Sequence, residues 1–193
     1  MRKIGFLTLT SLVLALLALT TGGSHATAQE VFTCDGKTPT IVATAPGTIN
    51  GTSGNDVIVG TAGDDIINGG AGNDTICGEG GDDTIHGGSG EDRMWGEVRG
   101  GDVLIGVAGS DDLKGGSGGD LLVDSIGAGQ TLDGGSGNDT IVGFGTLNGG
   151  SGVDSLRVGG TPTGPSTLSG GSGKDTCDPF SADDALKSCE TVV

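Results

Sequence analysis

Residues 51–95 read GTSGNDVIV, GTAGDDIIN, GGAGNDTIC, GEGGDDTIH and GGSGEDRMW, which are five consecutive blocks of nine residues. A ten-residue block, GEVRGGDVLI, follows from Gly96, and then come GVAGSDDLK and GGSGGDLLV. The pattern recurs as GGSGNDTIV from Gly134, GGSGVDSLR from Gly149 and GGSGKDTCD from Gly170. The shared form is G-G-x-G-x-D-x-U-x, in which U is a large apolar residue. Repetition at a fixed period indicates a solenoid or array, in which each repeat is one structural unit.

Each block is expected to form a six-residue turn and a three-residue strand. Gly and Asn tolerate the positive φ angles that tight turns require. In the three strand residues, only the middle side chain would point inward. Two blocks then make one coil of eighteen residues, and the coils would stack as parallel strands about 4.8 Å apart. The fold class predicted is all-β: a right-handed parallel β-roll, or solenoid, with short caps at its N- and C-terminal ends.

The inward positions form a single narrow apolar ladder between two sheets. They are Ile49, Ile58, Ile67, Ile76, Ile85, Met94, Leu104, Leu113, Leu122, Leu132, Ile141, Leu147, Leu156, Leu168 and finally Cys177. One core side chain per block is little apolar material for a folded domain. We therefore expect bound metal to supply part of the folding free energy.

The eleven near-copies resemble the RTX, or hemolysin-type, calcium-binding nonapeptide repeats. The resemblance covers about residues 51–178, and it implies that calcium lies between stacked turns, held by position-six carboxylates and loop carbonyls. The matching residues, taken as candidate metal ligands, are Asp56, Asp65, Asp74, Asp83, Asp92, Asp102, Asp111, Asp120, Asp139, Asp154 and Asp175. A merely solvated acidic surface would not explain a fixed place for Asp within a glycine turn.

Successive blocks alternate sides, so these aspartates should form two columns. One column runs from Asp65 through Asp83, Asp102, Asp120, Asp139 and Asp154 to Asp175. The other holds Asp56, Asp74, Asp92 and Asp111 and then fails, because Gln130 takes the next Asp place and the turns GFGT and GGTPTGPST follow. If each adjacent pair binds one ion, about six sites lie in the first column and three in the second, as an upper estimate. The extra residue between Gly96 and Gly101 leaves the sites around Asp102 open.

The composition agrees with metal binding and excludes several partners. The chain has 43 Gly, no Tyr and one Trp, and its net charge is −16. Such an acidic chain is not expected to bind nucleic acid or anionic membranes. The acidic residues are mostly Asp, which suits cation-binding loops better than helices. We predict Ca²⁺ as the cofactor and a monomeric protein, with a protein or glycan partner left open.

The N-terminal residues indicate export. Arg2 and Lys3 precede an apolar run over residues 4–19, and residues 26–28 read Ala-Thr-Ala, which is typical of a cleaved signal peptide. A membrane anchor is less favoured, because the run is short for a bilayer. Cleavage after Ala28 would leave 25 acidic and seven basic residues, a charge near −18. We expect a secreted, extracellular protein with a signal peptide (1–28), an N-terminal cap (29–50), the β-roll (51–178) and a C-terminal cap (179–193).

Four cysteines suggest two disulfides in an exported chain, for which three pairings exist. Residues 179–193 leave the repeat and should bring Phe180, Leu186 and Cys189 over the last coil. Cys177–Cys189 is the preferred pair for this reason, and Cys34–Cys77 remains by elimination. A zinc site is disfavoured, because there is no CxxC pair and a single His after the signal peptide.

We predict no catalytic residues and no enzyme activity. There is no HExxH motif. Residues 115–119 read GGSGG and formally fit the GxSxG nucleophile motif, but Ser117 falls in a repeat turn, whereas a nucleophile elbow needs a strand-to-helix setting and a His partner. His86 follows an ordinary inward residue and is expected to be a surface side chain. The function predicted is calcium-coupled folding into an extracellular scaffold or surface module, and an adhesin or ligand-binding module is the alternative.

Overall fold

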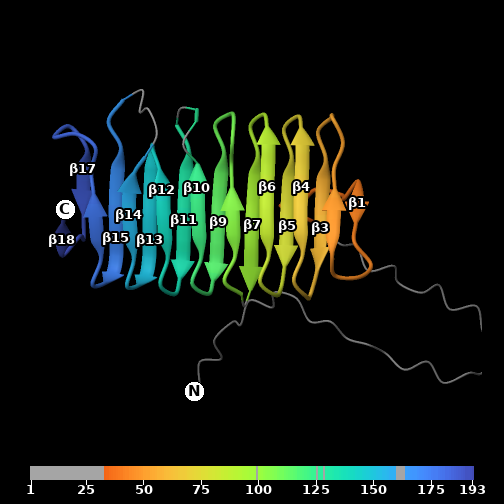
Figure 1. Cartoon of the computed structure of the whole chain (residues 1–193), viewed down its shortest axis with the longest axis horizontal. Coiled ribbons are helices and arrows are strands. Elements are labelled where there is room, and N and C mark those ends of the chain that lie inside the picture. Colours follow the sequence, from red (N-terminus) through yellow and green to blue (C-terminus); the bar gives the residue numbers. More distant parts are fainter. Residues whose placement is uncertain (1–32, 99, 125, 128, 160–163) are drawn as a thin grey trace, which may run out of the picture. The chain divides into compact units, whose positions relative to one another are not determined.

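The computed structural model describes residues 33–98, 100–124, 126–127, 129–159 and 164–193. Every element in these residues is a β-strand, and the strands form two nine-stranded sheets in which all pairs are parallel. Odd-numbered strands make one sheet and even-numbered strands make the other (Figure 1). The chain therefore crosses from one sheet to the other at every turn. The predicted parallel β-solenoid is confirmed.

The strands of the first sheet are β1 (Ile41–Val42), β3 (Val57–Thr61), β5 (Thr75–Glu79), β7 (Arg93–Val98), β9 (Asp112–Ser117), β11 (Thr131–Ser136), β13 (Thr146–Gly152), β15 (Thr167–Gly173) and β17 (Ala185–Lys187). Those of the second are β2 (Thr48–Asn50), β4 (Ile66–Ala71), β6 (Thr84–Ser89), β8 (Val103–Ile105), β10 (Leu121–Asp124), β12 (Thr140–Gly143), β14 (Ser155–Val158), β16 (Thr176–Asp178) and β18 (Thr191–Val192).

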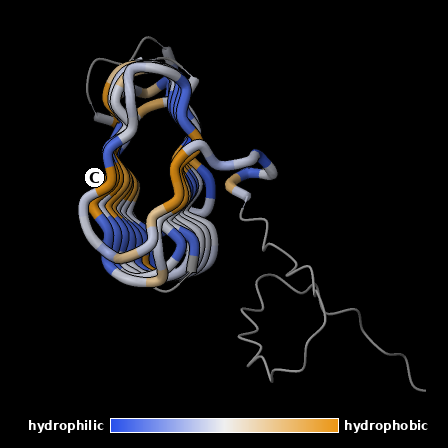
Figure 2. Tube along the Cα trace, turned by 90° about the vertical axis from the view of Figure 1, so that its right-hand side faces the viewer, coloured by the Kyte–Doolittle hydropathy of each residue, from blue (hydrophilic) through white to orange (hydrophobic). Residues whose placement is uncertain are grey.

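The predicted ladder forms the core. Its members align in register from coil to coil, as in Ile58 with Ile76 and Ile67 with Ile85. All fifteen predicted inward residues are buried, with Ile49 the most exposed at 9 %. Viewed along the stack in Figure 2, hydrophobic segments line up from coil to coil in both walls, and hydrophilic segments line up beside them. Phe144 and Val158 also join the core, which the nine-residue period does not predict.

Most strands are longer than the three residues predicted. β4 continues through Gly69 and Gly70, and Gly70 pairs with Gly88 of β6. A Cβ at Gly70 would lie 2.2 Å from the carbonyl oxygen of Thr52, and the residue has a φ of +113°. The paired glycines therefore let neighbouring backbones approach where any side chain would collide. In blocks of this kind the turn proper is confined to the middle of the block.

Beyond Leu122, the irregular blocks change the turns on one side of the stack only. Nine residues separate Leu132 from Ile141, but six separate Ile141 from Leu147. Twelve residues separate Leu156 from Leu168. The ladder stays in register through both changes, since Leu132 pairs with Leu147 and Leu147 with Leu168. These later changes are thus absorbed in the turns of the second column, whereas the extra residue between Met94 and Leu104 lies in a first-column turn.

Both preferred disulfides are present. Cys34 bonds to Cys77, and Cys177 bonds to Cys189. Around the first bond, Val59 and both cysteines form a small buried cluster separate from the main core. Arg93 pairs with Asp35, and Lys37 Nζ donates to Thr75 Oγ1 at 2.7 Å. These contacts fix the N-terminal segment against the first sheet.

The C-terminal residues extend both sheets instead of leaving the repeat. Leu186 in β17 lies opposite Leu168 in β15, and Val192 in β18 lies opposite Cys177 in β16. The prediction that Phe180 covers the last coil is wrong, because its side chain is 65 % exposed. Strand pairing and the Cys177–Cys189 bond cover the C-terminal end of the stack, and the aromatic ring of Phe180 does not.

Candidate metal centres

The position-six aspartates form hydrogen-bonded columns. In the first column, the backbone N–H of Asp65 donates to Oδ1 of Asp83 at 2.9 Å, and the N–H of Asp83 donates to Oδ1 of Asp102 at 2.8 Å. The same bond recurs at 2.8–2.9 Å as far as Asp175. Asp175 then donates to Oε2 of Glu190 at 2.7 Å. One carboxylate oxygen of each Asp therefore joins its coil to the one before.

The second column is shorter, as the sequence predicts. Asp56, Asp74, Asp92 and Asp111 are linked by the same bond at 2.8–2.9 Å. The next turn carries Gln130, which is 1 % exposed. Further along, Ser166 accepts from the N–H of Gly145 and donates its own N–H to Oδ1 of Asp184. Beyond the defect, the Ser166 hydroxyl thus replaces a carboxylate for one link, and the Asp184 carboxylate makes the next.

All eleven candidate aspartates are buried, with exposed fractions from 0 to 6 %. Charged side chains are seldom buried without a partner. In seven of them the second carboxylate oxygen, Oδ2, has no hydrogen-bond partner: Asp74, Asp83, Asp92, Asp120, Asp139, Asp154 and Asp175. A buried acceptor left unpaired costs about 1–3 kcal/mol. A cation bound at these Oδ2 atoms would therefore remove the cost of leaving them unpaired.

The two repeats that begin with Gly-Thr differ. Thr52 donates its N–H and its hydroxyl to Oδ2 of Asp56, at 2.6 and 2.9 Å. Thr61 does the same for Asp65, at 2.7 and 2.9 Å. The threonine donors satisfy these two Oδ2 atoms within their own turn. The unpartnered oxygens consequently begin one coil later, at Asp74 and Asp83.

The first glycine of a block leaves room beside Oδ2. A Cβ at Gly69 would lie 2.5 Å from Asp74 Oδ2 and 2.5 Å from the carbonyl oxygen of Gly87 in the next coil. At Gly149 the matching atoms are Asp154 Oδ2 and the Gly170 carbonyl oxygen. A carboxylate oxygen and a carbonyl oxygen from adjacent coils thus face one small space. These are ligand types that calcium prefers.

Side chains alone would not complete such a site. In the described part of the chain, no three Asp, Glu, His or Cys side chains gather closely enough to hold a metal ion. Calcium takes six to eight oxygen ligands, including backbone carbonyls and water. Zinc, by contrast, is held mainly by Cys and His side chains. The donors present fit calcium, with carbonyl oxygens as necessary ligands.

Burial makes the columns hard to charge without a cation. Burial raises the pKa of Asp83 to about 7, and it raises the pKa of Asp92, Asp111 and Asp120 to about 6. The backbone N–H of the preceding coil opposes each rise, and neighbouring aspartates in the column reinforce it. A bound cation would favour the ionised carboxylates and reverse this shift.

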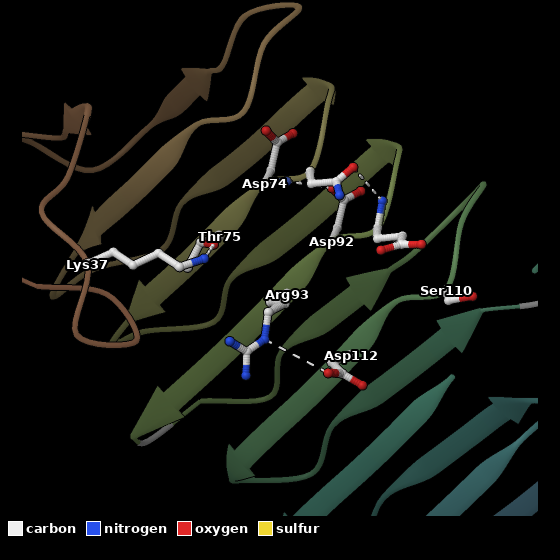
Figure 3. Close-up of a pocket in the computed structure, with 9 residues that line it drawn as sticks. Lys37, Asp74, Thr75, Asp92, Arg93, Ser110 and Asp112 are labelled. Carbon is white, nitrogen blue, oxygen red and sulfur yellow. Dashed lines mark hydrogen bonds and ion pairs between the residues drawn. The ribbon is translucent and has the colours of Figure 1, made fainter. Parts of the chain in front are cut away.

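A cavity of about 260 Å³ lies beside the second column (Figure 3). Asp74 and Asp92 line it, together with Lys37 and Arg93. Arg93 Nε lies 3.9 Å from Oδ2 of Asp112. The positively charged side chains of Lys37 and Arg93 therefore lie beside the acidic residues here, where the N-terminal segment packs against the first sheet.

The sequence motifs that suggest catalysis do not form a site. Ser117 is the last residue of β9 and lies in register with Ser136 of β11, in a regular parallel sheet. A nucleophile elbow requires a sharp turn from strand to helix, and a helix is absent from the described residues. His86 lies within β6, half-buried, beside Asn68 and Ile105 on the neighbouring strands.

One buried acidic residue is missing from the predicted set. Asp124 ends β10, is 1 % exposed, and its Oδ2 has no hydrogen-bond partner. Its register partner in β12 is Gly143, so it stands where other blocks carry their first glycine. The signal in the sequence was an Asp in a glycine place. The consensus conceals this signal, because it assigns carboxylates to position six alone.

The fold and these columns define a parallel β-solenoid with buried aspartate ladders along its turns. The sequence matches the family described as RTX calcium-binding nonapeptide repeat (4 copies), over residues 50–85, 78–98, 99–123 and 127–145. The chain therefore carries RTX calcium-binding nonapeptide repeats over residues 50–123 and 127–145. The match identifies repeats and no catalytic domain. No curated protein matches the chain.

Two further observations concern its surroundings. None of the described residues forms a helix long and apolar enough to cross a membrane. Disulfides persist mainly in oxidising compartments, and the described residues hold two of them, Cys34–Cys77 and Cys177–Cys189. The predicted signal peptide, residues 1–28, lies outside the described residues.

Proposed function

We propose that this protein is secreted and binds several calcium ions in its turns, and that it becomes fully stable only when they are bound. The observation that carries the proposal is the series of buried, unpartnered Oδ2 atoms facing carbonyl oxygens of the next coil. The ligands proposed are the eleven position-six aspartates named above. We expect the strongest sites where Oδ2 is unpartnered, and weaker ones at Asp56 and Asp65.

Calcium would act by neutralising the columns. Without it, like charges repel along each column, and the glycine-rich chain loses much entropy on folding. The core contributes one large side chain per block, which is little to set against these costs. An ion that binds only the folded state adds its binding free energy to stability. Extracellular calcium would thus hold the roll in its folded form.

The proposed role is an extracellular scaffold or surface module without catalytic activity. A binding module is a second candidate, because Val103 and Leu121 lie side by side on the outer face of β8 and β10, with Leu121 36 % exposed. Such a surface fits a protein or glycan partner. Binding screens of the calcium-loaded chain, repeated with Leu121→Asp, would separate a binding module from a scaffold.

The deciding experiment is circular dichroism of the purified, disulfide-bonded chain during calcium titration. We expect a cooperative gain of β signal, reversed by a chelator, and a higher unfolding midpoint in calcium. Magnesium at equal concentration is the control, because it demands near-ideal octahedral geometry and retains its waters. Spectra and midpoints identical in calcium and in chelator would overturn the proposal.

A further inference from the structure

The turn at which the second column loses its regular aspartates contains two buried polar side chains. Asp124 occupies a glycine place, and Gln130 occupies an aspartate place. Both are 1 % exposed. Each departs from the repeat consensus, and the two departures fall within one turn. Two unrelated losses would not be expected to bury two polar groups together.

These side chains converge with the last regular aspartate of the column. A point at the Cβ position of Gly106 lies 2.5 Å from Asp111 Oδ2 and 2.8 Å from Asp124 Cγ. The two carboxyl groups therefore share the space that Gly106 leaves open. Burial raises the pKa of Asp124 to about 6, and the Gln130 side chain, which lies within hydrogen-bonding reach of that carboxyl, opposes the rise.

The available hydrogen bonds leave this group incomplete. Asp124 Oδ1 accepts from the N–H of Ile126 at 3.3 Å, but Asp124 Oδ2 has no partner. The Gln130 side chain approaches the Asp124 carboxyl, but neither its Nε2 nor its Oε1 meets both the distance and the angle of a hydrogen bond. Asp111 Oδ2 has one contact, a long one of 3.3 Å from the N–H of Val107. Buried amide and carboxylate oxygens without partners indicate a ligand that takes several oxygens at once.

We propose that Asp111, Asp124 and Gln130 form a further calcium site, outside the nonapeptide consensus, which extends the second column by one ion. Asp111 and Asp124 supply two negative charges, and Gln130 supplies its amide oxygen as a neutral ligand. This assignment rests on the proposed function, because it gives the same ion to one more turn. Because Gln130 occupies the position-six place, no aspartate is available there. Asp124, at the first place of the same block, supplies the carboxylate instead.

The competing arrangement is a metal-free pair, in which a protonated Asp124 bonds to the Gln130 amide. The two arrangements predict different ion counts. Native mass spectrometry of the full chain in calcium should show one ion fewer in Asp124→Asn than in the wild type. Asp133→Asn is the matched control, because it removes one charge in the same coil from a side chain that bonds to Asn148 instead. An unchanged ion count in Asp124→Asn would overturn the site.

The Gln130→Glu variant provides a second test that does not need Asp124→Asn to fold. At a calcium site, a third carboxylate should tighten binding at that site by roughly tenfold, since affinity rises with ligand charge. In a metal-free pair, the same change buries another charge and lowers the unfolding midpoint in calcium as well as in chelator. That second result would overturn the proposal. A wild-type chain that binds no calcium would instead refute the proposed function as a whole.

Discussion

The backbone N–H of Asp83 donates to Oδ1 of Asp102 at 2.8 Å, across 19 residues of chain. The regular spacing in the column is 18 residues, as between Asp65 and Asp83. The extra residue of the block that starts at Gly96 therefore leaves the ladder unbroken. The same bond spans 15 residues from Asp139 to Asp154 and 21 from Asp154 to Asp175. The column is thus set by strand register, whatever the length of the intervening turns.

Asp120 lies in the middle of the first column. Two substitutions there can separate the two roles of its carboxylate, which are to accept the N–H of Asp102 and to bind calcium. Asp120→Asn keeps an oxygen for the N–H of Asp102 but removes the charge, so it should lose calcium-dependent stability only. Asp120→Ala also leaves that N–H unpaired and should cost about 1–3 kcal/mol more. Urea unfolding with calcium and with chelator measures both. Asp183→Asn, on an exposed side chain, is the control, and equal stability of Asp120→Asn and wild type in calcium would contradict a ligand role.

Gly69 tests the space beside Oδ2. In Gly69→Ala the new Cβ would lie 2.5 Å from Asp74 Oδ2 and from the Gly87 carbonyl oxygen. Because neither atom can move without opening the coil, we expect a loss of about 1–3 kcal/mol and weaker calcium binding. Gly54→Ala is the matched control, since its nearest neighbour, Thr52 Oγ1, would be 3.8 Å away. Similar midpoints for the two variants in thermal unfolding would show that the space is unimportant.

The nine-residue period predicts most of this fold. It predicts the inward ladder, the two aspartate columns and the loss of the regular aspartates from the second column after Asp111. Each of these follows from counting along a repeated unit. The period does not predict the burial of Phe144 and Val158, since both lie near the shortened and lengthened turns, where the nine-residue spacing is interrupted. The long strands also escape it, because glycine reads as a turn residue although Gly70 and Gly88 pair in a sheet.

The candidate sites are predicted less completely, for a chemical reason. The consensus locates one carboxylate per block, but it does not reveal which oxygen the neighbouring coil has already taken. Thr52 satisfies Asp56 through two donors, whereas glycine at the same place leaves Asp74 Oδ2 unpaired. Asp124 is missed because it stands at a glycine place. Such differences depend on contacts across 18 or more residues.

The Cys34–Cys77 bond should stabilise the roll more than Cys177–Cys189 does. It links residues 43 apart in sequence, against 12 for the other bond, and a longer closed loop restricts the unfolded chain more. We expect Cys34→Ser with Cys77→Ser to cost about 2–4 kcal/mol, with a smaller loss for the other pair. Urea unfolding in calcium measures both. A larger loss from the C-terminal pair would show that closing that end matters more than the loop-length effect.

Acidity should stabilise the calcium-free roll. The pKa of Asp83 is raised to about 7, and those of Asp92 and Asp120 to about 6, chiefly by burial. A carboxyl with a raised pKa binds its proton more tightly in the folded state, so its contribution to stability is complete below the unfolded pKa and is lost as the pH rises through the folded value. In chelator, the urea midpoint should therefore rise as the pH falls from about 8 to about 5, through the raised pKa values. In calcium the trend should weaken or reverse, because protons compete with the ion for the same oxygens. A calcium-free midpoint that falls on acidification over this range would mean that the columns are not buried as described.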